Sequence, residues 1–134
     1  MRYLIFAPTI LLFLACQPFD TSKIIEPTDY QIQSVSFNLS KEVIPTNMAA
    51  QKVEGSTGFT LVGAKLQQGN QNFIALWIFN TQDSSDIRSM NHNAQEFSDF
   101  PHLTAISTKD EASNLIVFLE RHLSLLKQAS TNQI

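Results

Sequence analysis

The sequence predicts an α+β fold, a two-layer domain of about four mixed strands with two helices packed on one face. Three observations lead to this expectation. Residues 30–39 alternate between apolar and polar, and residues 73–79 form an unbroken apolar run. Two later segments repeat apolar residues at spacings of three and four, as helices do. A length of 134 residues favours one domain, which we place at residues 29–128.

The first predicted elements are strands. Residues 30–39 change the phase of their alternation near residues 33–34, which predicts a strand with a β-bulge. Residues 59–67 and 73–79 are predicted to pair as a hairpin, because the residues 69–72 between them tolerate turn conformations. The run at residues 73–79 is expected at the centre of the sheet, since its apolar residues do not alternate.

Residues 40–57 leave two alternatives open. Thr46 or Asn47 suits the N-cap of a short helix over residues 48–53, or the whole stretch is a loop. The next predicted helix covers residues 84–98, with Asp83 as its N-cap. A short strand is expected at residues 103–107, parallel to a neighbour after a right-handed crossover.

The clearest helix follows Thr108. Thr108 and Glu111 match a capping box, in which each side chain satisfies a free backbone N–H of the first turn. Residues 129–134 are polar and lack a pattern, so we expect a disordered tail. The apolar stripe of this helix consists of Ala112, Leu115, Ile116, Leu119, Leu123 and Leu126.

The N-terminus carries an uncharged, apolar run at residues 3–15 behind the basic Arg2. As a helix this run would be about 20 Å long, whereas the hydrocarbon core of a bilayer measures about 30 Å. Pro8 also interrupts it. These features predict a secretory signal peptide rather than a membrane span.

The end of the apolar run resembles the signal of bacterial lipoproteins. Leu12 and Leu14 approach an Ala15–Cys16 boundary, and Cys16 is the single cysteine of the chain. The resemblance implies a signal peptide at residues 1–15 and lipidation of Cys16 with acyl chains such as palmitate. The two prolines and the polar residues that follow Cys16 predict a tether, so that residues 16–28 comprise the lipidated cysteine and this tether. Gln17 at the next position implies the periplasmic side of the outer membrane. The alternative is an ordinary cleaved signal and a secreted protein.

The charge and the cysteine count argue against several classes of function. The net charge of −3 offers no basic surface for a phosphate backbone, so we expect no nucleic-acid partner. One cysteine forms neither an internal disulfide nor a cysteine-rich metal site. No catalytic residues are assigned and no cofactor or metal is expected.

Two features of the sequence suggest a metal site and a sugar-binding site, respectively. His92 and Glu96 are four residues apart on the predicted helix, and Asp99 or His102 would complete a metal site. The alternative is a solvated face with polar pairs at helical spacing, which we favour. Trp77 would stack on a sugar if it were exposed, but its position in the apolar run predicts a core residue.

Phe118 and Leu125 define a candidate interface. Both lie about 130° around the last helix from the centre of its main stripe. Either the helix is covered on two sides, or these residues form a patch for a partner or for a second copy of the chain.

The sequence therefore predicts a lipid-anchored, periplasm-facing accessory or interaction protein of the bacterial envelope, non-enzymatic. Its partners would be the bilayer, reached through acylated Cys16, and an envelope protein or a homo-oligomer. One alternative is a small binding module for a hydrophobic or saccharide ligand. Another is a small metal-dependent hydrolase that uses His92, Glu96 and His102.

Overall fold

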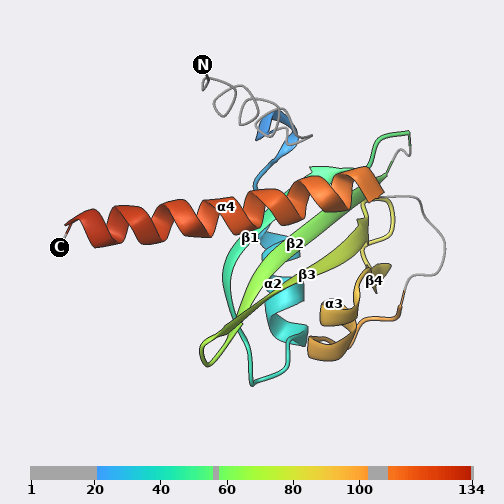
Figure 1. Ribbon diagram of the computed structural model, residues 1–134. Helices are drawn as coiled ribbons and strands as arrows, with labels where there is room; N and C mark the ends of the chain where they lie inside the picture. Colours follow the sequence, from blue (N-terminus) through green and yellow to red (C-terminus); the bar gives the residue numbers. More distant parts are fainter. Residues whose placement is uncertain (1–20, 56–57, 103–108, 134) are drawn as a thin grey trace, which may run out of the picture.

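The computed structural model describes residues 21–55, 58–102 and 109–133, and gives only the backbone of residues 122–133. A four-stranded sheet lies between helices on its two faces (Figure 1). In chain order the elements are the 3-10 helix η1 (Thr21–Lys23), α2 (Asp29–Asn38), β1 (Ile44–Lys52), β2 (Phe59–Gln68), β3 (Gln71–Asn80), β4 (Ile87–Ser89), α3 (His92–Phe97) and α4 (Lys109–Gln133).

The sheet is an antiparallel meander in the order β1-β2-β3-β4. The predicted hairpin is confirmed as β2 and β3, which pair from Phe59 with Asn80 to Gln68 with Gln71. Gly69 closes the turn at a φ of 60°, a conformation that glycine adopts without steric cost. Because β2 and β3 are the inner strands, the central position expected for the apolar run is also confirmed.

Successive residues of a strand point to opposite faces of the sheet. The strands therefore contribute side chains to two separate hydrophobic cores, one on each face. Trp77 belongs to one core and its neighbours Leu76 and Ile78 to the other. The first core is completed by residues of α2 and α3, whereas the second contains Leu115 and Leu119 of α4. The α+β class is confirmed.

Helices therefore cover both faces of the sheet, which differs from the predicted arrangement. The two helices that the sequence indicated correspond to α3 and α4, and they pack in different cores. The named strands are all antiparallel rather than mixed. A parallel bridge joins Ser89 to His102, while the strand expected at residues 103–107 lies outside the described residues.

The strand predicted at residues 30–39 was wrong, because this segment forms α2. Thr28 and Gln31 make a capping box: the Gln31 N–H donates to Thr28 Oγ1 at 3.1 Å, and the Thr28 N–H donates to Gln31 Oε1 at 2.9 Å. Gln31 and Val35, four residues apart, face the protein interior. Phe37, which supported the alternating pattern, is 86% exposed.

Residues 40–57 contain strand β1, which neither predicted alternative included. Its small residues divide between the two cores, with Ala49 in one and Ala50 in the other. A register shift between Pro45 and Asn47 marks an irregularity in its pairing with β2.

The helix predicted at residues 84–98 is shorter and starts later. Its first part is strand β4, and α3 begins only after Asn91, whose side chain accepts from the Ala94 N–H at 3.0 Å. Asp83 instead accepts from the Ser85 N–H at 3.1 Å within a turn. The apolar spacing that suggested one helix is therefore shared between two elements.

The last predicted helix is confirmed as α4. Two hydrogen bonds fix its first turns to the end of β1 and the residues just after it. The Asn114 side chain donates to Gln51 Oε1 at 2.6 Å in a buried contact, and the Glu54 N–H donates to Glu111 Oε2 at 3.0 Å in a partly buried one. Thr108 lies outside the described residues. The C-terminal half of α4 extends past β1 (Figure 1) and remains helical through residues 129–133, where the sequence predicts a disordered tail.

Candidate functional site

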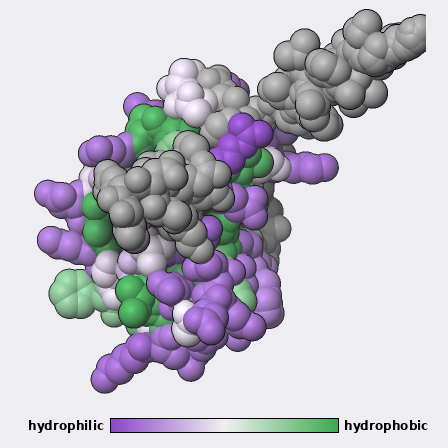
Figure 2. All heavy atoms as spheres, turned by 60° about the vertical axis from the view of Figure 1, so that its left-hand side comes forward, coloured by the Kyte–Doolittle hydropathy of each residue, from purple (hydrophilic) through white to green (hydrophobic). Residues whose placement is uncertain are grey.

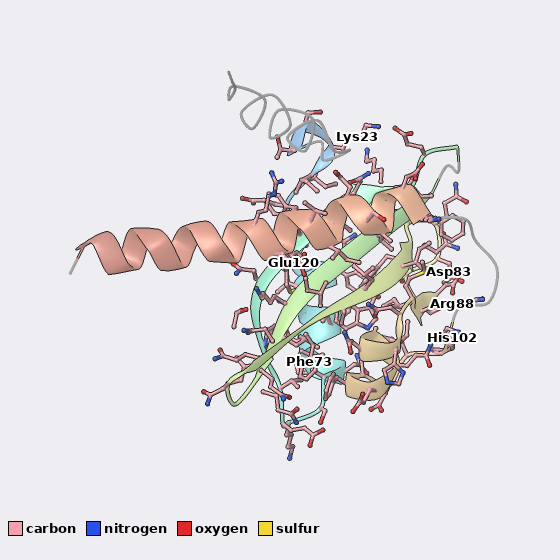
Figure 3. The ribbon with its side chains drawn as sticks, viewed as in Figure 1. Lys23, Phe73, Asp83, Arg88, His102 and Glu120 are labelled. Atoms are coloured by element: carbon pink, nitrogen blue, oxygen red, sulfur yellow. The ribbon has the colours of Figure 1, made fainter. Side chains whose placement is uncertain are left out.

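The N-terminal segment binds the edge of the sheet a few residues after the predicted lipidation site at Cys16. The Ile25 N–H donates to the Ala50 carbonyl at 2.8 Å, and the Ala50 N–H donates to the Ile25 carbonyl at 2.9 Å. Lys23 forms a 2.6 Å ion pair with Glu54, and Figure 3 shows Lys23 beside the first half of α4. Lys23 and Ile25, within the predicted tether at residues 16–28, are thus attached to the folded body.

A groove of about 330 Å³ opens beside this attachment, and we name it the edge groove. It lies where the N-terminal segment, β1 and α4 meet. Its lining is mainly apolar, with polar groups at Thr21, Glu26 and Asn47. The remaining lining residues are Ile24, Ile25, Met48, Ala49, Phe118 and Leu119.

The outer edge of β1 contributes backbone groups to the edge groove. In a strand, the N–H and C=O groups of alternate residues point to the same side. The groups of Ala50 point outward to Ile25, so those of Met48 point to the same outer side. Pro27, two residues after Ile25, has no N–H to continue the pairing. The groove therefore combines apolar side chains with an outward-facing peptide group.

The sequence did not predict the edge groove. Ile24 and Ile25 fall within the predicted tether, although they are adjacent apolar residues in a mainly polar segment. Ile24 packs against the α4-side core, and Ile25 is 42% exposed. The apolar pair was the available signal, but β1, its binding partner, was itself not predicted.

A second pocket of about 420 Å³ lies between β2, β3, α4 and the start of α3, and we name it the asparagine pocket. The Asn91 and Asn93 side chains both donate to the Ile74 carbonyl, at 3.0 and 2.9 Å. Phe73, labelled in Figure 3, is also a lining residue, and its ring packs against Phe97 in the other core at a centroid distance of 5.3 Å. The other lining residues are Lys65, Asn72, Ile116 and Glu120.

The candidate metal ligands do not share one site. His92 Nε2 lies 3.4 Å from Glu96 Oε1, and both side chains are exposed. His102 instead hydrogen-bonds through Nδ1 to the Gln95 side chain. Within the described ranges, no three histidine, cysteine, aspartate or glutamate residues are grouped to hold a metal ion. His92, Glu96 and His102 therefore do not converge, and Asp99 is an exposed residue beyond α3.

Trp77 is a core residue, as predicted. Its side chain is fully buried, and its Nε1–H donates to Ser98 Oγ at 2.9 Å. Ser98 Oγ in turn donates to the Ala94 carbonyl. The indole holds α3 against β3 and has no exposed face for a sugar.

The carboxylate of Asp86 has a shifted pKa. The Arg88 guanidinium donates to Asp86 at 2.9 Å, and the Asn80 side chain donates to the same carboxylate at 3.2 Å. These two hydrogen bonds hold the pKa of Asp86 below its usual value, with the Arg88 contact the larger cause. Both partners favour the charged carboxylate, so this group stabilises the turn before β4.

The exposed apolar side chains are spread over the surface. Phe37 is 86% exposed and Ile44 is 63% exposed. Figure 2, which brings the β1 side forward, shows green hydrophobic areas separated by purple hydrophilic ones. Phe118 of the candidate interface is partly buried against the α4-side core and lines the edge groove. The Leu125 side chain lies outside the described residues.

No family model, curated protein or solved structure matches this chain. In the described part of the chain, no helix has both the length and the apolar character that a membrane span requires. Cys16 and Gln17 lie outside the described residues, so the lipidation site stays a prediction.

Proposed function

We propose that this protein is a lipid-anchored accessory protein of the bacterial envelope that binds an envelope protein and has no enzymatic role. We place it on the periplasmic side of the outer membrane, held by acylated Cys16. The observation that carries the proposal is the attachment of residues 21–25 to the edge of the sheet. It lies just after the single cysteine, which ends a signal-like apolar run.

The length of chain between anchor and body limits their separation. Thr21 is the fifth residue after Cys16, and extended chain spans at most about 3.3–3.6 Å per residue, or about 18 Å here. An anchored body would therefore keep the η1 side of its sheet close to the bilayer. Each buried acyl CH₂ contributes about 0.8 kcal/mol to membrane binding, so two or three chains would hold it firmly.

Phe37 is the side chain best suited to contact a protein partner. It is the most exposed of the large hydrophobic residues on the described surface, and aromatic side chains are enriched among the residues that dominate binding energy. It lies on α2, which packs against the opposite face of the sheet from α4. An anchored body would thus contact the bilayer and the partner through different surfaces.

The test is a cross-linking pull-down from envelope membranes. Three full-length forms are compared: the wild-type protein, Phe37→Asp, and the matched control Ile44→Asp, which places the same charge at another exposed apolar position. We expect the wild-type and the control to retain one envelope protein in stoichiometric amount and Phe37→Asp to lose it. Equal recovery by all three forms, or recovery of no specific protein, would contradict the proposal.

A second candidate function is the binding of a small saccharide or hydrophobic ligand in the asparagine pocket. The observation that favours it is the combination of amide side chains with the partly buried Phe73 and Ile74. Pockets with apolar walls and a few fixed polar groups are typical ligand sites. Titration with N-acetylglucosamine oligomers tests it: saturable binding that Asn93→Ala weakens would support this function, and the absence of binding would contradict it.

A further inference from the structure

The edge groove lies at the end of the segment that leads back to Cys16. Thr21, the first described residue, lines it, together with Ile24 and Ile25 of the following turn. Phe118 and Leu119 of α4 form the opposite wall. A group attached to Cys16 therefore reaches the groove within the span of about 18 Å that five residues allow.

The size and polarity of the edge groove suit one hydrocarbon chain. Its volume of about 330 Å³ is at the lower end of the range of about 300–1,000 Å³ for small-molecule pockets. Its lining is mainly apolar, which favours a hydrocarbon chain over a polar ligand. Glu26 at the rim is exposed, and its negative charge disfavours a free fatty-acid carboxylate but not an acyl chain in covalent linkage.

We infer that the edge groove holds an acyl chain carried by Cys16 of the same molecule while the protein is away from a bilayer. This inference rests on the proposed lipidation. Burial of the chain in the groove would shield its hydrocarbon from water. In contact with a membrane, the larger apolar volume of the bilayer would compete for the same chain.

The experiment labels the single cysteine and does not depend on natural lipidation. The mature chain from Cys16 to Ile134 retains every described residue, and its only thiol is alkylated with a maleimide that carries a dodecyl chain ending in an environment-sensitive fluorophore. The measurements are the emission wavelength and the quenching by iodide, without lipid or detergent, over a range of protein concentrations.

Two variants provide the comparison. Ile25→Asp places a charge in the edge groove, whereas the matched control Ile44→Asp makes the same change at an exposed position of β1 that does not line it. Circular dichroism and the emission of Trp77 in unlabelled samples establish that each variant is folded. If Ile25→Asp does not fold, Thr21→Trp replaces it, because an indole at the rim obstructs the groove without adding a charge.

For the wild-type chain and Ile44→Asp we expect blue-shifted emission and protection from iodide, independent of protein concentration. In Ile25→Asp the ratio of docked to free chain should fall by about tenfold or more, since the charge opposes apolar burial. Equal protection in Ile25→Asp and Ile44→Asp, or protection that requires high protein concentration, would overturn the inference. Mass analysis of the natural N-terminus tests lipidation separately, so the two failures are distinguishable.

Discussion

Replacement of Gly63 by valine tests how closely α4 packs on the sheet. Gly63 lies in β2, and a Cβ atom at this position would come within 3.0 Å of both Leu119 Cδ1 and Leu76 Cδ2. Carbon atoms prefer separations of about 3.5–4.0 Å, so each contact would overlap by about 0.5–1.0 Å. Both leucine side chains are buried and have little room to move.

The two opposing effects of Gly63→Val give an expected magnitude. Overpacking of a core costs about 1–3 kcal/mol, whereas replacement of glycine within a strand recovers about 0.5–1 kcal/mol. The midpoints of these two ranges give an expected net loss of about 1 kcal/mol in the free energy of unfolding. Urea titration, followed by the emission of the single tryptophan, Trp77, and by circular dichroism, measures this loss.

A double-mutant cycle supplies the control. Leu119→Ala alone should cost about 2–5 kcal/mol, because a buried side chain is removed. In its background Gly63→Val should cost less than in the wild-type protein, with a coupling energy of about 0.5–1.5 kcal/mol, because one of the two overlaps that together cost about 1–3 kcal/mol is gone. Unchanged or increased stability of Gly63→Val, or strict additivity in the cycle, would refute the close packing of α4 on β2.

Three further predictions concern single side chains. Trp77→Phe should lower the free energy of unfolding by about 1–3 kcal/mol in a urea titration monitored by circular dichroism, because Ser98 loses its buried partner; an unchanged midpoint would argue against this hydrogen bond. Asp86→Asn should cost at most about 1 kcal/mol at pH 7. Because the pKa of Asp86 is lowered in the folded state, this difference should vanish as the pH falls below about 4; a difference that persists under acid would contradict the assignment. Phe118→Asp should destabilise the monomer by about 1–3 kcal/mol, whereas lost self-association with intact stability in sedimentation experiments would identify an interface.

The sequence allowed the hairpin and the last helix to be predicted because each has one dominant signal. The apolar residues of 73–79 are needed on both faces of β3, since cores lie on both sides of the sheet. Among the described stripe residues of α4, Leu115 and Leu119 are fully buried. In both elements the burial that the fold requires matches the spacing that the sequence displays.

The errors arose where local hydrogen bonding overrides apolar spacing. The exposed Phe37 completed an apparent strand pattern in residues 30–39, although Thr28 and Gln31 carry a capping box that starts a helix. Asn91, rather than Asp83, caps α3. Its side chain also accepts from the Leu76 N–H at 3.1 Å, a tertiary contact that no local pattern reveals.

The candidate site was less predictable than the fold. The edge groove requires residues from the N-terminal segment, β1 and α4, which are far apart in the sequence. Its existence depends on the pairing of Ile25 with Ala50, and the small and polar residues of β1 gave no strand signal. The proposed anchor, by contrast, depends only on local sequence at Cys16.

The most direct test of the central claim is the intact mass of the protein isolated from its natural membrane, with sequencing of its N-terminal peptide. We predict a chain that starts at Cys16 and carries the added mass of acyl chains on that residue. A chain that starts beyond residue 16, or one with an unmodified Cys16 thiol, would contradict the account.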